Sequence, residues 1–210
     1  MPETVSTDPV SGFLHRPAEP NGRAVALTHG AGGDARMPLL STVADALAAN
    51  GFVVLRYDLP FRRKRAKGSP SGSGAADREG VAAAIALLRE QGAQHVYAAG
   101  QSYGGRQSSM LLAEQPDIAD GLLLLSYPLH PPGKAEQLRT AHFPSLKIPT
   151  LFVSGTKDPF GSPDELTTAL TLIPGKHELV LIEGAGHDLK RGRFDLDERL
   201  VKPFLALIQS

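Results

Sequence analysis

The sequence predicts an α/β fold in which a mostly parallel, doubly wound sheet carries helices on both faces. Three observations support this prediction. The chain has 210 residues, a length that suits one domain with a single large core. Short runs that are apolar throughout are typical of strands buried on both faces, as in parallel sheets. These runs alternate with longer stretches of helical spacing, which indicates strand–helix–strand units. We therefore treat residues 1–210 as one domain.

Six buried strands and five helices are predicted. The strands are residues 24–29, 52–58, 95–101, 121–127, 150–155 and 178–184. The helices are residues 37–50, 75–92, 105–115, 162–173 and 194–209. In the second helix, Val81, Ile85 and Leu88 recur at intervals of four and three residues and so define one helix face. The N-terminal arm, residues 1–20, contains a run at 11–16 that would add an antiparallel edge strand, giving six to seven strands.

Composition narrows the class of protein. Hydrophobic residues make up 41% of the chain and charged residues 21%, which is typical of a soluble globular domain. The 22 basic residues balance the 22 acidic ones, so the whole molecule has no positive field for nucleic acid or an anionic membrane. Cysteine is absent, which excludes disulfides and thiolate catalysis. The N-terminal residues lack the basic and apolar regions of a secretory signal, and we expect a cytoplasmic protein.

A candidate nucleophile lies in the segment GQSYG, residues 100–104. It matches the G-x-S-x-G pattern of a nucleophile elbow, in which a strained turn between a strand and a helix exposes a serine. The pattern alone is weak evidence, but here a predicted strand precedes Ser102 and a predicted helix follows it. Ligands of parallel sheets bind beyond the carboxyl ends of the strands, where this turn is expected.

Serine needs a base to take its proton and an acid to orient that base. In proteins with a nucleophile elbow, the acid and then the histidine follow the serine along the chain. Asp158 comes three residues after the predicted strand 150–155, and His187 comes directly after the strand 178–184. The order and positions predict a Ser102–Asp158–His187 triad. Asp164 is the alternative acid, although its position suits the first turn of a helix.

An acyl-transfer site also needs backbone N–H groups where the oxyanion forms. One is expected from Tyr103, the residue after the nucleophile, and a second from the loop that follows residues 24–29. In that loop Ala31 is the first candidate and Gly32 the second. His29 is expected to order the loop by hydrogen bonding, and it also enters our set of candidate substrate-binding residues.

The same loop offers a rival interpretation. Gly30, Gly32 and Ala35 fit a G-x-G-x-x-A dinucleotide fingerprint, with Asp58 as the ribose partner. A Rossmann-type oxidoreductase is therefore an alternative. It leaves the serine, aspartate and histidine positions unexplained, and Gly32 to Asp58 exceeds the usual spacing of about 20 residues.

Two segments are candidates for shaping the substrate cleft. The connection 128–143 is short and has no long apolar helix, which predicts a minimal lid and small acyl substrates. Tyr127 and His130 lie where they could line the cleft, with ordinary loop packing as the equal alternative. Residues 59–74 read as a long surface loop with a basic run made of Arg62, Arg63, Lys64, Arg65 and Lys67. That run is a solvated loop, a steering patch for a carboxylate-bearing substrate, or a contact for a nucleic acid or another partner, the last being weakened by the neutral net charge.

Several runs resemble one group of small α/β-hydrolases. They are THGAGGD, RYDLPFRRKR, GQSYGGR, SYPLHPPGKAEQLRTAHF, PTLFVSGTKDPFG and GAGHDLK. The group includes the testis-expressed hydrolase-like protein and a subunit of the non-specific-lethal histone acetyltransferase complex, and dienelactone hydrolases are more distantly similar. The resemblance implies the α/β-hydrolase fold and the same three triad positions. It also implies an alternative, a non-catalytic interaction module, because some relatives look like scaffolds.

We therefore expect a serine hydrolase, carboxylesterase-like, that acts on a small acyl substrate through an acyl-enzyme intermediate. The chemistry requires no cofactor and no metal. Dienelactone hydrolases carry cysteine where this chain has Ser102, so their substrate does not transfer. The sequence specifies neither the natural substrate nor the oligomeric state.

Overall fold

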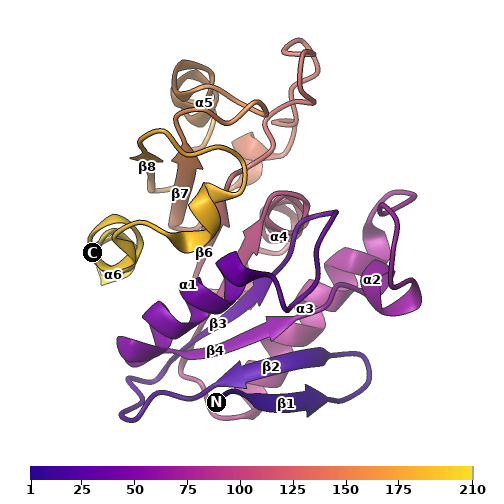
Figure 1. Ribbon diagram of the computed structural model, residues 1–210, viewed down its shortest axis with the longest axis vertical. Helices are drawn as coiled ribbons and strands as arrows, with labels where there is room; N and C mark the ends of the chain where they lie inside the picture. The colour runs from indigo at the N-terminus through magenta and orange to yellow at the C-terminus, as the bar shows by residue number, and fades with distance from the viewer. Residues whose placement is uncertain (210) are drawn as a thin grey trace.

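An eight-stranded sheet forms the centre of the computed structural model, which describes residues 1–209 (Figure 1). Its strands are β1 (Glu3–Ser6), β2 (Ser11–His15), β3 (Arg23–Thr28), β4 (Val53–Tyr57), β5 (His95–Gln101), β6 (Gly121–Leu125), β7 (Thr150–Gly155) and β8 (His177–Ile182). Their order across the sheet is β1-β2-β4-β3-β5-β6-β7-β8. The first two are antiparallel to their neighbours, and β3 to β8 are parallel. The mostly parallel α/β sheet predicted from the sequence is confirmed.

Both faces of the central strands are buried. In β3, Ala24 and Ala26 belong to one apolar core, whereas Val25 and Leu27 belong to the other. Successive side chains of a strand point to opposite faces, so a run without polar residues fills two cores at once. This explains why these strands are apolar throughout.

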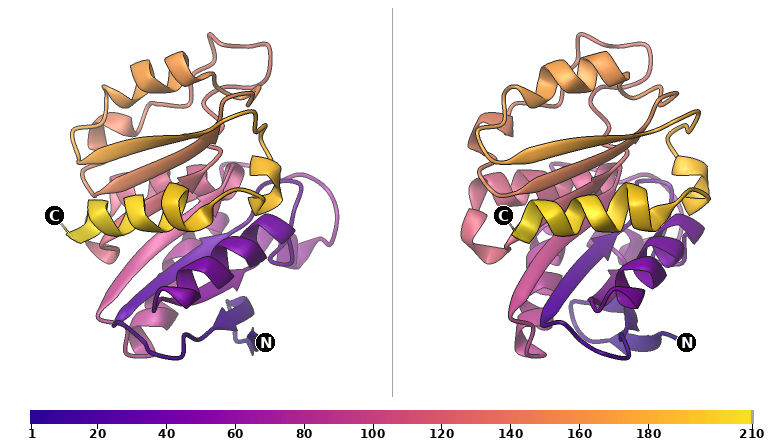
Figure 2. Two further views of the ribbon diagram at one scale, coloured as in Figure 1. Left: turned by 60° about the vertical axis from the view of Figure 1, so that its left-hand side comes forward. Right: turned by 90° about the vertical axis from the view of Figure 1, so that its left-hand side faces the viewer.

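Two layers of helices cover the sheet (Figure 2). The helices are α1 (Pro38–Ala49), α2 (Pro60–Lys64), α3 (Ala75–Glu90), α4 (Tyr103–Glu114), α5 (Pro163–Leu170) and α6 (Lys202–Gln209). The side chains of α1 and α6 fill the core on one face, and those of α3, α4 and α5 fill the core on the other. The predicted helix 194–209 begins as a π-helical segment, Asp197–Val201, before it continues as α6.

The N-terminal arm supplies two antiparallel edge strands. The strand expected at 11–16 is confirmed as β2, which pairs with β4. Sequence reasoning missed β1. This strand has four residues, of which Val5 alone is buried, so it shows no apolar pattern.

The interpretation of residues 59–74 as a surface loop was partly wrong. The segment begins with α2, in which Pro60 occupies the first turn and the Phe61 N–H donates to the Asp77 carboxylate at 2.9 Å. Asp77 lies in the first turn of α3. The helix is too short to show a periodic pattern, and its position depends on this contact with another helix.

The connection between β6 and β7 forms no lid helix. Within residues 126–149 the structure has one short 3-10 turn, Phe143–Ser145, and Phe143 is buried in the core beneath it. The minimal lid expected from the sequence is confirmed. Across residues 1–209, no helix combines the length and the apolar character needed to cross a bilayer.

Strand order separates this fold from the dinucleotide-binding one. In the order 3-2-1-4-5-6, the third parallel strand lies outside the second. Here the third, β5, pairs directly with the first, β3. The chain therefore reverses direction across the sheet between β3 and β5, and the carboxyl ends of these two strands mark the position expected for a ligand.

Three histidines, two of them buried and the third half-buried, have lowered pKa values. Burial lowers the pKa of His15, which accepts a hydrogen bond from Arg56 Nε at 2.8 Å. Burial also lowers the pKa of His29, and together with the Arg106 charge it lowers that of His142 to about 4. The folded state therefore favours the neutral form of all three side chains.

We predict that the free energy of unfolding falls as the pH drops from 7.5 to 5. In this range the unfolded chain protonates these histidines while the folded chain resists protonation, so acid favours unfolding. Each histidine lowers the free energy of unfolding by at most about 1.4 kcal/mol per pH unit, over the range between its pKa in the folded state and its pKa in the unfolded state. Urea titrations at several pH values measure how steeply the free energy of unfolding depends on pH. This dependence should be weaker for His142→Phe than for wild type. A stability that is constant or rises toward pH 5 would contradict this prediction.

Candidate active site

Ser102 lies in a strained turn between β5 and α4. Its backbone has a φ of +52° and a ψ of −115°, a conformation that non-glycine residues rarely adopt. Its N–H donates to the Leu125 carbonyl of β6 at 2.8 Å, which holds the turn against the sheet. The serine side chain is thereby placed at the carboxyl end of β5.

Glycines let the strand and the helix approach each other. A Cβ atom at Gly100 would lie 2.5 Å from the Gly105 nitrogen, and one at Gly104 would lie 2.4 Å from the His29 carbonyl oxygen. Both distances are too short for non-bonded atoms, so the backbone path requires residues without side chains. The G-x-S-x-G pattern therefore has a steric cause here.

The structure brings Ser102, His187 and Asp158 together. Ser102 Oγ lies 2.8 Å from His187 Nε2. His187 Nδ1 lies 2.8 and 3.0 Å from the two carboxylate oxygens of Asp158. A proton on Nδ1 satisfies the carboxylate and leaves Nε2 free to accept the serine proton.

Asp158 is the acid that the fold places beside the histidine. Its side chain is 1% exposed, and the Phe160 N–H donates to its Oδ1 at 2.9 Å. The alternative, Asp164, lies in the first turn of α5, and it is not among the hydrogen-bond or ion-pair partners of His187. Gly155 permits this arrangement, because a Cβ there would lie 2.2 Å from the carbonyl oxygen of Ala185, in the loop that carries His187.

Sequence reasoning missed two residues that support His187. The Phe160 ring stacks on the imidazole with a centroid distance of 4.1 Å. Gln101 Nε2 donates to the His187 carbonyl at 3.2 Å. The one available signal was their position beside the acid and the nucleophile, in DPFG and GQSYG.

The loop after β3 lies against the serine. A Cβ at Gly30 would lie 3.3 Å from Ser102 Cβ. Among residues 1–209, the N–H groups of Ala31, Gly32 and Tyr103 donate to no protein acceptor. These are the three residues from which sequence reasoning expected oxyanion donors, and the fold leaves their N–H groups available.

His29 orders this loop from below. Its side chain is fully buried. Nδ1 donates to the Gly30 carbonyl at 2.8 Å, and Nε2 accepts from the Leu59 N–H at 3.1 Å. This agrees with the expected ordering role, whereas burial leaves no surface for the substrate contact that was also considered. Asp58, the residue suggested as a ribose partner, accepts from the Ala35 N–H at 2.7 Å and lies 3.6 Å from His29.

Arg62 also holds backbone in place, which differs from the expected substrate contact. It projects from α2 and is 8% exposed. Its guanidinium makes five hydrogen bonds of 2.8–3.4 Å, to the carbonyls of Ala31, Gly33, Arg65, Ala66 and Gly68. These bonds join the loop after β3 to the segment after α2. A guanidinium has five N–H donors, so none is left for a ligand.

A buried carboxylate supports the other side of the elbow. Tyr103 Oη donates to Asp77 Oδ2 at 2.7 Å, and Asp77 Oδ1 accepts from Phe61 in α2. Burial, reinforced by Asp77, raises the pKa of Tyr103. Sequence reasoning did not single out Asp77, because a first-turn acid in a helix is ordinary.

Tyr127 and His130 pack as loop residues. Tyr127 is 2% exposed, and its Oη donates to the Arg139 carbonyl at 2.6 Å. His130 is 5% exposed, with Nδ1 on the Pro131 carbonyl and Nε2 3.4 Å from Glu165. The interpretation as ordinary loop packing fits both residues, and the expectation that they line the cleft does not.

A sequence model of the alpha/beta hydrolase domain family matches residues 21–199. The match covers most of the chain and includes the strands and loops just described. The chain therefore belongs to the alpha/beta hydrolase family.

Solved structures agree with this fold. An alpha-beta serine hydrolase homologue from Coxiella burnetii has a TM-score of 0.73 and 18% identity, covering 100% of this chain and 96% of its own. A dienelactone hydrolase from Anabaena variabilis has a TM-score of 0.72 and 21% identity, and the match covers 100% of this chain and 95% of that one. Est1E from Butyrivibrio proteoclasticus has a TM-score of 0.75 and 16% identity over 100% and 99%. At these identities the similarity establishes the fold.

One curated relative matches a short segment. The polyketide synthase ThaQ from Burkholderia thailandensis is 50% identical over 48 residues. The match spans 23% of this chain and 2% of the length of that protein.

We predict that Gly104→Ala destabilises the fold, because the new methyl group would meet the His29 backbone at 2.4 Å. Overpacking of this kind costs about 1–3 kcal/mol. Gly32→Ala is the matched control, since a Cβ there has no atom within 4 Å. Thermal and urea unfolding of both variants measure the difference. Equal stability of the two would show that the close approach is not a constraint.

Proposed function

We propose that this chain is a serine hydrolase that cleaves small acyl esters, with Ser102 as nucleophile, His187 as base and Asp158 as the group that orients the base. The observation that carries the proposal is the continuous contact from Ser102 Oγ to His187 Nε2 and from Nδ1 to Asp158, with 2.8 Å at each step. The carboxylate would hold the imidazole in the required tautomer and stabilise the imidazolium formed during the reaction.

The reaction would proceed in two steps. Nε2 of His187 takes the hydroxyl proton as Ser102 Oγ bonds to the ester carbonyl carbon, and the carbonyl electrons move to oxygen. N–H groups of Tyr103 and Ala31, or of Gly32 in place of Ala31, bind this oxyanion. The intermediate collapses, and the alcohol leaves with the proton from His187. Water then attacks the acyl-enzyme with the same base and releases the acid.

The surroundings of the site support a small substrate. Within residues 1–209 no lid helix covers the site, and the His187 side chain is 23% exposed, so the scissile bond stays near the surface. Ester bonds are also cleaved more readily than amide bonds, because an alcohol is a better leaving group than an amine. The lack of cysteine supports a cytoplasmic location.

The resemblance to the testis-expressed and non-specific-lethal subunit type supplies the second candidate, a non-catalytic interaction module. The intact hydrogen-bonded chain of serine, histidine and aspartate favours catalysis, since a scaffold does not require it. Reactivity at Ser102 separates the two candidates.

We expect a fluorophosphonate probe to label the wild-type protein at Ser102, because the attack on phosphorus uses the same activated oxygen. Ser102→Ala should abolish labelling, and Ser71→Ala, a change at an exposed serine, should leave it intact. Labelling is read by intact-mass spectrometry. Folded wild-type protein that stays unlabelled would favour the interaction module.

The two candidate acids make different predictions. Asp158→Asn should lower kcat for an aryl ester by about 10⁴-fold, because it removes the charge and favours the wrong imidazole tautomer. Asp164→Asn, on the surface of α5, should change kcat by less than about twofold. Steady-state kinetics with 4-nitrophenyl acetate compare them. Similar losses in both variants would refute the assignment of Asp158.

A further inference from the structure

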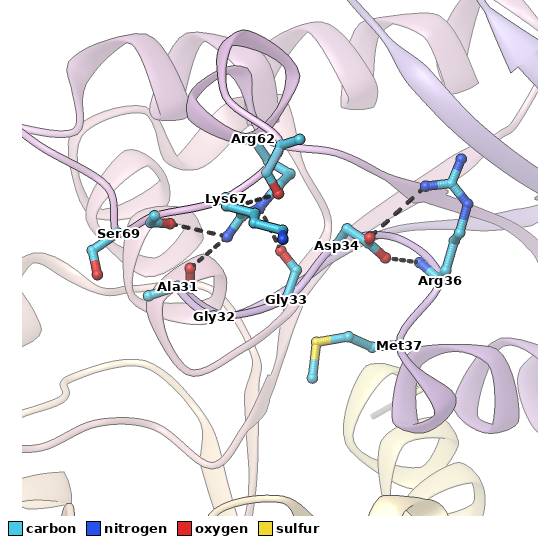
Figure 3. Close-up of a pocket in the computed structure, with 11 residues that line it drawn as sticks. Ala31, Gly32, Gly33, Asp34, Arg36, Met37, Arg62, Lys67 and Ser69 are labelled. Carbon is cyan, nitrogen blue, oxygen red and sulfur yellow. Dashed lines mark hydrogen bonds and ion pairs between the residues drawn. The ribbon is translucent and has the colours of Figure 1, made fainter.

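A pocket of about 420 Å³ lies beside the candidate oxyanion loop, on the side of the segment that follows α2 (Figure 3). Its lining includes Ala31, Gly32 and Gly33 from the loop after β3 and Lys67 from the segment after α2. The pocket adjoins the candidate active site, because Ala31 directly follows Gly30, which lies against Ser102. Its volume falls in the range of small-molecule sites.

The pocket is positively charged. Its lining includes three basic residues, Arg36, Arg62 and Lys67, and one acidic residue, Asp34. Asp34 accepts a hydrogen bond from the Arg36 backbone N–H at 2.7 Å and lies 3.8 Å from the Arg36 guanidinium. The negative charge of Asp34 is therefore partly neutralised by Arg36. The Arg36 guanidinium also lies 5.6 Å from the centre of the Phe13 ring.

Two of the cations lack an acidic partner. Among residues 1–209, no carboxylate lies within 4 Å of Arg62, whose hydrogen bonds all go to neutral carbonyls. The Lys67 ammonium has no protein acceptor in the same part of the chain, and Lys67 lines the same pocket as Arg62 and Gly33 (Figure 3). Neighbouring cations repel each other, and an anion placed between Lys67 and the loop would relieve this repulsion.

We propose that this pocket binds a carboxylate carried by the substrate, with Lys67 as its direct partner and Arg62 as a fixed positive charge behind the wall. The proposal rests on the proposed function and adds the substrate class, esters that bear an anionic group. Lys67 selects among substrates and takes no part in the chemistry. Gly32 leaves room for the ligand, since a Cβ there would meet no atom within 4 Å.

A matched pair of esters tests the proposal. The 4-nitrophenyl monoester of glutaric acid ends its acyl chain in a carboxylate, and 4-nitrophenyl pentanoate has the same number of acyl carbons and no charge. We compare wild type with Lys67→Met and with Lys64→Met, which removes an equal charge from the same basic run outside this pocket. Arg62 is left unchanged because it holds the loop.

In Lys67→Met we expect kcat/KM for the glutarate monoester to fall roughly tenfold, and the pentanoate value to stay within about twofold. Lys64→Met should resemble wild type for both esters. Added salt should weaken the preference for the charged ester in wild type more than in Lys67→Met. The proposal would be overturned if the two lysine substitutions had equal effects, or if wild type did not prefer the glutarate monoester over the pentanoate ester.

Glutarate binding provides a readout that does not depend on turnover. Calorimetry should detect binding to wild type and Lys64→Met, and a loss of at least about fivefold in affinity for Lys67→Met. If neither ester is cleaved yet glutarate binds in this Lys67-dependent way, the proposed function fails and the carboxylate site stands. If the esters are cleaved but glutarate binding ignores Lys67, the site fails and the hydrolase function stands.

Discussion

The close approach of β5 and α4 is the constraint on which the rest of the site depends. Gly100 and Gly105 allow the two backbones to come within a distance that no side chain would permit, and the chain then has to turn at Ser102 with a positive φ. This strain costs on the order of 1–3 kcal/mol and persists because the sheet and two cores hold both flanks of the turn. This turn fixes the position of Ser102, and the loop that carries His187 and the loop after β3 both pack against it.

Helix α2 connects both sides of the proposed oxyanion site, although it has five residues. Phe61 reaches Tyr103 through the Asp77 carboxylate, and Arg62 holds the Ala31 carbonyl directly. Because C=O and N–H point in opposite directions across a trans peptide, fixing the Ala31 carbonyl also fixes the direction of the Gly32 N–H. By the same geometry, the hydrogen bond from His29 to the Gly30 carbonyl fixes the direction of the Ala31 N–H.

Sequence reasoning recovered the features that follow local rules. Apolar runs and helical spacing located β3 to β8, and turn chemistry located Ser102, Asp158 and His187, which the fold brings into contact. It failed where position depends on residues distant in sequence. Arg62 and His130 are polar residues in segments that the sequence presents as loops, and they looked available to substrate. In the structure Arg62 belongs to α2, and both side chains are buried and hydrogen-bonded to backbone carbonyls. Asp77 gave no periodic or motif signal, and Phe160 gave only its position beside the acid, since the roles of both residues arise from tertiary contacts.

Gly32 has a consequence for how such a site can change over evolutionary time. In the same loop, a Cβ at Gly30 would lie 2.5 Å from Gln101 Oε1 and one at Gly33 would lie 1.9 Å from Met37 Sδ, so a larger residue at either position requires that side chain to move. At position 32 the backbone φ lies outside the left-handed region and the space is open. A single codon change there would narrow the pocket with little penalty to folding. Substrate preference could therefore diverge between related hydrolases while the nucleophile turn, bound by its glycines, stays fixed.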